Sequence, residues 1–170
     1  MKRFLVMFVC TGNLCRSPMA EGILKNLVLD EVESRHILFP IDVFSAGIHA
    51  EEGLHAARHA VEAAAVHGIS LQFHRSRQIT GAAARAANLI LTMENRHSEY
   101  IHHHWADVGN VHELKRYGRE EMFQPGEADV LDPMGYGAET YRQVFDELRE
   151  EVTRISRILF PLVREKYTVS

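Results

Sequence analysis

A cysteine, an arginine and a serine follow one apolar segment close to the start of the chain. The run Phe4–Val9 leads into Cys10, and five residues separate this thiol from Arg16 and Ser17. Backbone N–H groups of such a short turn can converge on an anion, and a following helix N-terminus adds positive partial charge. The same dipoles stabilise a thiolate, and a guanidinium can hold two phosphate oxygens at once. This order of residues therefore predicts a cysteine that attacks phosphorus.

The segment Val9–Pro18, Val-Cys-Thr-Gly-Asn-Leu-Cys-Arg-Ser-Pro, resembles the nucleophile loop of the low-molecular-weight protein tyrosine phosphatase family. Further matches extend as far as Tyr141, so the resemblance covers nearly the whole chain. The chain is closest to the bacterial branch of this family, which also includes protein arginine phosphatases. The resemblance implies one phosphatase domain over residues 1–170, a phosphorylated protein as substrate, and no metal or other cofactor.

The motif assigns a role in phosphoryl transfer to each polar side chain of the loop. Cys10 should attack the phosphoryl group and form a cysteinyl-phosphate, which divides the reaction into two steps. Arg16 should bind the phosphoryl oxygens and stabilise the charge of the transition state. Ser17 can donate a hydrogen bond to the sulfur, cap the following helix, or do both. Taken alone, Cys10 could equally be a small buried hydrophobic residue at a strand end.

The second step needs an acid that protonates the leaving oxygen and later deprotonates water. Asp132, followed by Pro133, is the best candidate, because it comes late in the chain after a polar loop. The resemblance implies the same residue, since the family carries its general acid in an Asp-Pro motif just before the last helix. A helix cap is the alternative role for Asp132, and Asp129 and Glu127 are the alternative acids.

The bound phosphate should be surrounded by Thr11, Gly12, Asn13, Leu14, Cys15, Arg16 and Ser17. Gly12 and Asn13 both tolerate the left-handed backbone that a tight loop demands. The resemblance places Ser45 and His74 where the family has groups that hydrogen-bond to Asn13. Cys15 could condense with a sulfenic acid at Cys10 to form a protective disulfide, or it could simply be a packing thiol.

The residues expected at the mouth of the pocket leave the choice of substrate open. Tyrosine phosphatases of the eukaryotic branch usually follow Asp-Pro with two aromatic residues, whereas Met134 and Tyr136 stand here, with a glycine between them. Arginine phosphatases of the bacterial branch often carry threonine where this chain has Leu14. Leucine cannot orient a water molecule, and it presents an apolar wall that suits a phenyl ring. We therefore expect phosphotyrosine as the substrate, with phosphoarginine as the alternative.

Three other functions are compatible with parts of this pattern. An arsenate reductase with its own disulfide relay would need a cysteine after Cys15, and there is none, although a glutaredoxin-dependent variant stays open. A non-catalytic phosphoryl-binding module and a redox sensor built on the two cysteines are the others. Turnover of an aryl phosphate that is lost in Cys10→Ser would separate a catalyst from the binding module.

Composition limits the class of protein further. The 170 residues are 46% hydrophobic and 25% charged, which is ordinary for one globular domain. The net charge of −4 gives no reason to expect a nucleic-acid partner, and no apolar run approaches the ~18–20 residues of a membrane span. With only two cysteines, both in the motif, a reducing compartment is expected, and we therefore predict a cytoplasmic location. We expect a monomer or a weak dimer.

Histidines gather in one short stretch of the chain. His97, His102, His103 and His104 precede Trp105, but their spacing does not bring them together on one helical face. We interpret this stretch as a solvated helix end, with a metal site as the less favoured alternative.

The apolar pattern predicts alternating strands and helices. Segments with the composition of strands are Phe4–Cys10, Ile41–Phe44, Leu89–Thr92 and Val111–Leu114. Helical spacing is found from Pro18 to Val28, in His55–His67, Thr80–Ala87 and Glu94–His104, and from Ala138 to Glu165. The charged stretch Asp30–His36 predicts a helix end and a loop, Glu120–Val130 predicts another loop, and Pro161 should kink or interrupt the last helix.

Such an alternation implies an α/β fold of three layers, in which helices cover both faces of a central four-stranded parallel sheet. Ligands of these folds bind at the carboxyl ends of the strands. The phosphate loop after the first strand should therefore lie at that edge of the sheet.

Overall fold

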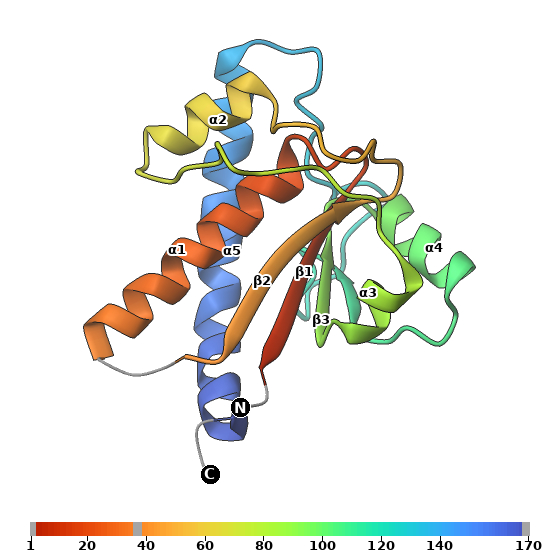
Figure 1. The fold of residues 1–170 in the computed structure, drawn as a ribbon. Helices are drawn as coiled ribbons and strands as arrows, with labels where there is room; N and C mark the ends of the chain where they lie inside the picture. The colour runs from red at the N-terminus through yellow and green to blue at the C-terminus, as the bar shows by residue number, and fades with distance from the viewer. Residues whose placement is uncertain (1–2, 36–38, 168–170) are drawn as a thin grey trace.

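A parallel sheet of four strands forms the centre of the protein, as a computed structural model describes it for residues 3–35 and 39–167 (Figure 1). The strands are β1 (Phe4–Cys10), β2 (Ile41–Gly47), β3 (Leu89–Thr92) and β4 (Val111–Glu113). They lie in the order β2-β1-β3-β4, and every neighbouring pair is parallel. The predicted four-stranded parallel sheet is confirmed.

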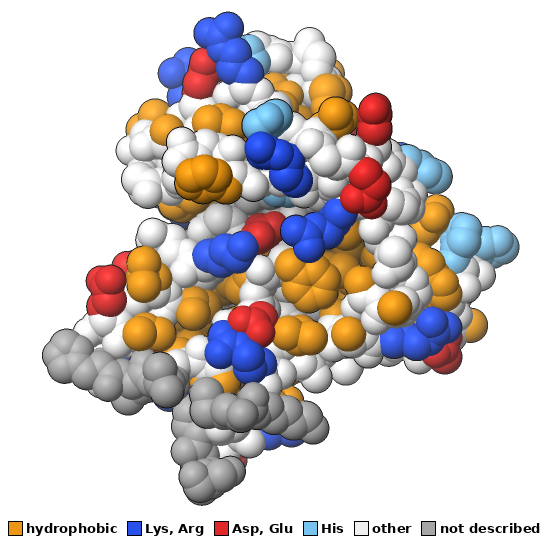
Figure 2. All heavy atoms as spheres, in the orientation of Figure 1, with side chains coloured by type: hydrophobic (Ala, Val, Ile, Leu, Met, Phe, Trp, Pro, Cys, Tyr) orange, Lys and Arg blue, Asp and Glu red, His pale blue; other side chains and the backbone are white. Residues whose placement is uncertain are grey.

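Helices pack on both faces of this sheet, which confirms the three-layer fold (Figure 1). One face is covered by α1 (Arg16–Arg35), α2 (Arg58–Ala65) and α5 (Ala138–Tyr167). The other carries α3 (Gly81–Ala86) and α4 (Asn95–His104). In the orientation of Figure 1, the surface carries side chains of both charges interspersed with apolar ones (Figure 2).

Strand β1 is buried from both sides because its side chains alternate between two hydrophobic cores. Val6, Phe8 and Cys10 belong to the core under α1 and α5, whereas Met7 and Val9 belong to the core under α3 and α4. This double burial explains why the segment is a continuous apolar run. It also fixes the position of Cys10 at the carboxyl end of a central strand.

Helix α1 is longer than the sequence predicted. It continues to Arg35, whereas a helix end and a loop were expected over Asp30–His36; His36 itself lies outside the described residues. No glycine or proline interrupts this stretch, and the Arg35 Nε lies 2.6 Å from a carboxylate oxygen of Glu31, one helical turn earlier. Such a pair supports a helix of charged residues.

The last helix was expected to kink or to be interrupted at Pro161, and the structure shows no interruption. Helix α5 does not stop there but continues to Tyr167. A proline within a helix removes one backbone hydrogen bond. Here Leu159, Phe160 and Val163 flank the proline and are buried in the core, and this burial offsets that loss.

Two smaller differences concern the segments on either side of the site. Strand β2 includes Ser45 and Gly47, because Gly47 still pairs with Cys10 of β1. Helix α2 begins only at Arg58, since the Ala57 backbone N–H donates to the Leu14 carbonyl at 2.8 Å. The helix was expected to end at Gly68. A turn precedes this glycine, and the helix ends at Ala65. Within the described residues, no helix combines the length and apolar character that a membrane span requires.

Candidate active site

The loop after β1 lies where the order of the strands changes direction. From β1 the chain crosses to β2 on one side, and β3 pairs on the other, which makes this edge the expected ligand site of an open parallel sheet. Cys10 ends β1 and Arg16 begins α1, so the intervening residues form the predicted strand-to-helix loop. The Cys10 Sγ is 2.9 Å from the Ser17 Oγ, and both side chains are buried.

Asn13 holds the loop in shape through its side-chain amide and its backbone carbonyl. Its Nδ2 donates to the Ser17 Oγ and to the Ser45 Oγ, both at 2.9 Å, and its Oδ1 accepts from the Arg77 backbone N–H at 2.9 Å. Its carbonyl accepts from the His74 Nε2 at 2.8 Å. The contacts expected of Ser45 and His74 with Asn13 are therefore present.

The backbone conformation of the loop confirms one of the two predictions about left-handed residues. Asn13 has a φ of 57°, in the left-handed region, as predicted. Gly12 does not, so that part of the prediction was wrong. Asn13 can hold the left-handed conformation because hydrogen bonds fix both the Nδ2 and the Oδ1 of its side chain.

Gly47 lets strand β2 approach this loop closely. A Cβ at this position would lie 2.4 Å from the Thr11 carbonyl oxygen and 2.9 Å from the Asn13 backbone nitrogen. Real Cβ atoms do not make contacts this short with backbone atoms, and backbone cannot yield as a flexible side chain does. The glycine of Ser45-Ala46-Gly47 is therefore a spacer that sets the position of the loop.

We expect Gly47→Ala to displace the loop. The overpacking should lower the free energy of unfolding by about 1–3 kcal/mol, and a loop shifted by a fraction of an ångström should lower kcat/KM for an aryl phosphate by about 10- to 100-fold. Thermal unfolding and steady-state kinetics measure the two effects. Gly109→Ala is the matched control, because nothing lies within 4 Å of its added Cβ. Equal behaviour of the two variants would contradict the spacer role.

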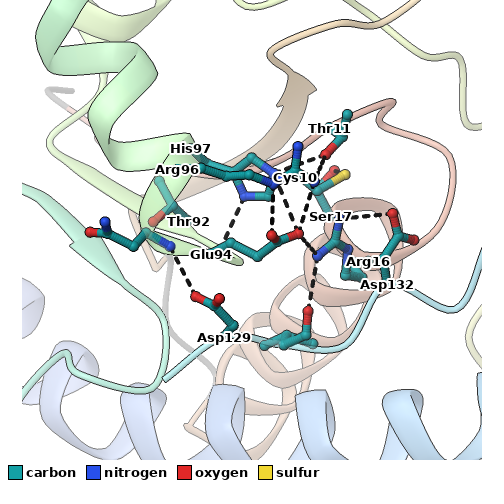
Figure 3. Close-up of polar contacts among 12 residues, drawn as sticks. Cys10, Thr11, Arg16, Ser17, Thr92, Glu94, Arg96, His97, Asp129 and Asp132 are labelled. Carbon is teal, nitrogen blue, oxygen red and sulfur yellow. Dashed lines mark hydrogen bonds and ion pairs between the residues drawn. The ribbon is translucent and has the colours of Figure 1, made fainter. Parts of the chain in front are cut away.

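Arg16 is buried and held by three acceptors (Figure 3). Its Nη1 forms an ion pair with Glu94 and donates to the Val130 carbonyl at 2.9 Å. Its Nη2 is 3.2 Å from the Asp132 Oδ2. Arginine in the first turn of a helix opposes the helix dipole. Here the carboxylates of Glu94 and Asp132 compensate that charge.

Glu94 joins Arg16 to a second arginine that the sequence analysis did not single out. Arg96 donates from its Nε to the Glu94 Oε2 at 2.7 Å, and from its Nη2 to the Thr11 Oγ1 at 2.8 Å (Figure 3). Burial by itself would raise the pKa of Glu94, but hydrogen bonds from Arg96 and Arg16 outweigh it and lower the pKa to about 2. Glu94 is therefore ionised at neutral pH, between two guanidinium groups.

The interpretation of His97 as part of a solvated helix end was wrong. His97 is fully buried, whereas His102, His103 and His104 are exposed, as expected. Burial and the charge of Arg16 lower the pKa of His97 to about 3, so its ring is neutral. Its Nδ1 accepts the Glu94 backbone N–H at 3.1 Å, and the Nε2 proton therefore faces the Thr11 Oγ1 at 3.0 Å. Among the described residues, no three metal-ligating side chains converge on one point.

The sequence contains a signal for the contact between Glu94 and His97. Glu94 caps α4 and His97 is the third residue of that helix, so the two form a reciprocal capping box. The spacing could have predicted a fixed His97, although not its contact with Thr11, which lies 86 residues earlier.

The loop before α5 brings Asp132 to the site. Its Oδ1 accepts the Met134 backbone N–H at 3.1 Å, its Oδ2 faces Arg16, and its side chain is 42% exposed. The alternative acids are engaged elsewhere: Asp129 accepts the Asn95 backbone N–H at 3.0 Å, and Glu127 accepts that of Gln124 at 2.8 Å. Of the three candidates, the described contacts place only Asp132 against Arg16.

The residues expected at the mouth of the pocket are exposed in the loop that carries Asp132. Met134 and Tyr136 follow it in the loop, and both are more than a third exposed. Leu14 is partly buried and packs against the core under α1 and α5. His49 was not singled out from the sequence. Its backbone N–H donates to the Thr11 carbonyl at 2.9 Å, and its side chain is exposed.

Cys15 is turned toward helix α5. Its Sγ is 3.3 Å from the Tyr141 hydroxyl, a contact between residues 126 positions apart. Burial raises the pKa of Cys15 to about 11, against the opposing hydrogen bond from Tyr141, so this thiol is protonated at neutral pH. Both cysteines are free thiols here, and the disulfide between Cys10 and Cys15 stays a prediction.

Comparison with known proteins identifies relatives over most of the chain. Residues 5–165 match the family described as low molecular weight phosphotyrosine protein phosphatase. A protein-arginine-phosphatase of Bacillus subtilis is 35% identical over 154 residues, which span 91% of this chain and 95% of that protein. A probable low molecular weight protein-tyrosine-phosphatase of Ralstonia nicotianae is 36% identical over 153 residues, which span 89% of this chain and 88% of that one.

Solved structures have the same fold. The arginine phosphatase of Geobacillus stearothermophilus has a TM-score of 0.82 at 31% identity, with 96% of this chain and 97% of that chain covered. The Wzb protein of Vibrio vulnificus, solved in complex with benzylphosphonate, has a TM-score of 0.77 at 26% identity, with 92% and 99% covered. The predicted fold and the predicted family are both confirmed. By the match over residues 5–165 and the loop at the end of β1, the chain belongs to the low molecular weight phosphotyrosine protein phosphatase family.

Proposed function

We propose that this protein hydrolyses phosphotyrosine monoesters in phosphorylated proteins through a phosphocysteine intermediate. One observation supports the proposal most strongly. A thiol in contact with a serine hydroxyl, a buried arginine and a half-exposed aspartate meet at one short loop, at the ligand-binding edge of the sheet. The function rests on this geometry and on the family to which the chain belongs.

In the first step the Cys10 sulfur attacks phosphorus. A sulfur–phosphorus bond forms, the bond from phosphorus to the tyrosine oxygen breaks, and Asp132 gives its proton to that leaving oxygen. Arg16 and the backbone N–H groups of the loop stabilise the charge on the phosphoryl oxygens. The Asn13 contacts fix the loop before substrate arrives, so this stabilisation needs no reorganisation of the loop.

In the second step the phosphocysteine is hydrolysed. Asp132, now a carboxylate, takes a proton from water as the water oxygen attacks phosphorus. The sulfur–phosphorus bond breaks, inorganic phosphate leaves, and Cys10 returns as a thiolate. The Ser17 hydroxyl, at 2.9 Å, can donate to the sulfur both when it attacks and when it leaves.

Leu14 is the residue that favours phosphotyrosine. Its apolar side chain on the loop suits a phenyl ring better than a guanidino group, and the exposed Tyr136 could pack on the ring from the mouth. The second candidate is phosphoarginine, because relatives of comparable similarity are named arginine phosphatases. In both cases Cys10, Arg16 and Asp132 have the same roles.

Matched peptides that differ only in the phosphorylated residue would decide between the two substrates. We expect kcat/KM without added metal to be at least about tenfold higher for phosphotyrosine than for phosphoarginine, the effect of one well-fitted apolar contact. Cys10→Ser provides the blank. A preference for phosphoarginine would contradict the role of Leu14 and leave the phosphatase mechanism intact. Turnover of both peptides that survives Cys10→Ser would contradict the mechanism itself.

The role of Asp132 has its own test. In Asp132→Asn we expect kcat for phosphotyrosine to fall by about 10²- to 10³-fold, because neither the leaving oxygen nor the attacking water is served by an acid–base group. An activated aryl phosphate needs no acid in the first step, so it should show a burst of phenol release followed by slow turnover. Asp129→Asn is the control and should change kcat less than about threefold. A larger loss in Asp129→Asn would reassign the acid.

We propose that residues 1–170 act as one phosphatase domain, as a monomer or weak dimer. A cytoplasmic location is supported by the chemistry, because the attacking sulfur of Cys10 must stay reduced.

A further inference from the structure

A cavity of about 360 Å³ lies beside the active-site loop, between the first turns of α1 and the segment of residues 70–77. Its size is within the range of small-molecule sites. Its lining includes Glu21 and Lys25 of α1, and Phe73, His74, Arg75 and Arg77 of the facing segment. None of the residues 10–17 lines it, so it is separate from the phosphate-binding loop.

Basic side chains dominate this cavity. Lys25 forms an ion pair with Glu21, the one acidic residue of the lining. Arg75 uses its Nη1 on the His74 carbonyl at 2.8 Å and on the His55 Nδ1 at 3.0 Å, and neither partner cancels its charge. The Arg77 guanidinium has no hydrogen bond or ion pair within the part of the chain that the structure describes. Figure 2 shows basic side chains gathered in the middle of this face around an acidic one.

The charge of the cavity is opposite in sign to the net charge of the protein. The chain has a net charge of −4, whereas Lys25, Arg75 and Arg77 leave the cavity positive after Glu21 is counted. Clefts lined by one sign of charge concentrate ions of the opposite sign. Guanidinium groups also match the planar pairs of oxygens in phosphate and carboxylate. A small anion with two or more such groups fits this lining.

Two walls of the cavity also hold the active-site loop. Glu21 accepts a hydrogen bond from the Ser45 hydroxyl, which in turn accepts from Asn13. On the opposite wall, the His74 Nε2 donates to the Asn13 carbonyl at 2.8 Å. An anion that pairs with Lys25 would weaken the ion pair between Lys25 and Glu21. Such an anion would therefore act on the hydrogen-bond path that runs from Glu21 through Ser45 to Asn13.

We propose that this cavity is a regulatory site for a small anion with at least two phosphate or carboxylate groups. Arg77 and Lys25 bind the anion, and Arg75 adds its charge. Occupancy changes turnover through Glu21, because Glu21 accepts the hydrogen bond of Ser45, which in turn holds Asn13 of the loop. The exposed ring of Phe73, 84% accessible at the edge of the cavity, covers any apolar part that the anion carries.

The test for binding uses methylenediphosphonate, which carries two phosphonate groups and cannot be hydrolysed between them. Saturating orthovanadate first occupies the loop around Cys10, so that only a second site can respond. Titration calorimetry of the vanadate-saturated protein should then show one further binding event per chain. Arg77→Gln should weaken this event by at least about tenfold, the usual effect of losing one charge-assisted hydrogen bond.

The control variant is Arg58→Gln, which removes an exposed arginine of α2 that pairs with Glu62 outside the cavity. It should bind methylenediphosphonate as the wild type does. Absence of a second event, or equal binding by wild type and Arg77→Gln, would overturn the proposal.

The regulatory part has a separate kinetic test. At saturating aryl phosphate, competition for the loop disappears, so any effect of methylenediphosphonate on kcat must come from another site. We expect a change in kcat of at least about twofold in the wild type and none in Arg77→Gln. Binding without a change in kcat would overturn the regulatory role. Because the calorimetric test needs no turnover, its result does not depend on the proposed phosphotyrosine activity.

Discussion

Replacing Cys10 with serine is expected to lower kcat for an aryl phosphate by at least about 10⁴-fold, equivalent to more than about 5 kcal/mol of transition-state stabilisation. A hydroxyl needs a base to become a useful nucleophile. Within the described residues the Cys10 sulfur hydrogen-bonds only with the Ser17 hydroxyl, so no imidazole or carboxylate stands ready to take a serine proton. Serine has the same shape as cysteine at this buried position, so the fold should be unchanged.

Steady-state kinetics and thermal unfolding together measure this effect. Inorganic phosphate should still raise the unfolding temperature of Cys10→Ser, because Arg16 and the loop backbone remain. The matched control is Cys15→Ser, which changes the second thiol of the loop. Cys15 is turned toward Tyr141, so its replacement should keep kcat within about tenfold of the wild type. A comparable loss in both variants would show that loop packing, and not the nucleophile, had been measured.

Replacing Arg16 with lysine should lower kcat/KM by about 10²- to 10³-fold, although the charge is kept. Arg16 is buried and uses its forked nitrogens on Glu94, the Val130 carbonyl and Asp132 at the same time. An ammonium group is a compact charge without this fork, so it cannot hold two phosphoryl oxygens in a fixed plane. The loss should be larger in kcat than in KM, because the fork matters most in the transition state.

Arg96→Lys is the control for this prediction, because Arg96 pairs with the same Glu94 but is 51% exposed. We expect it to change kcat/KM by less than about tenfold, as is usual for exposed ion pairs. Arg16→Ala should in addition reduce the free energy of unfolding by about 3 kcal/mol, because it removes one of the two cations that pair with the partly buried carboxylate of Glu94. Equal kinetic effects of Arg16→Lys and Arg96→Lys would contradict the distinct role of Arg16.

The nucleophile loop could be predicted from the sequence because its parts are adjacent in the chain. Cys10, Arg16 and Ser17 lie within eight consecutive residues, and the apolar run before them shows that they follow a buried strand. The alternation of strands and helices likewise predicted the parallel sheet, since local periodicity determines which elements form. Ser45 and His74 were placed by resemblance to a family, because nothing in their own neighbourhoods marks them.

Element boundaries were predicted less well, again for a physical reason. The ends of α1, α2 and α5 depend on an ion pair at Glu31, on the contact of Ala57 with the Leu14 carbonyl, and on the core around Pro161. The last two contacts form only when distant segments pack together, whereas the pair of Glu31 with Arg35 is local to α1. Local propensity therefore placed the centres of these helices correctly, but it missed the continuation of α1 to Arg35 and the bounds of α2.

The residues around Arg16 were decided by the tertiary structure alone. Glu94 lies 78 positions from Arg16, and Val130 lies 114 positions from it. His97 and Gly47 act on the loop only because β2 and β3 flank β1 in the sheet, which brings the ends of three strands to one edge. The sequence by itself determined the chemistry that the loop can perform, because that chemistry depends on neighbouring residues. The tertiary structure decided which distant side chains hold the loop, because strand order, and not sequence distance, determines what lies beside it.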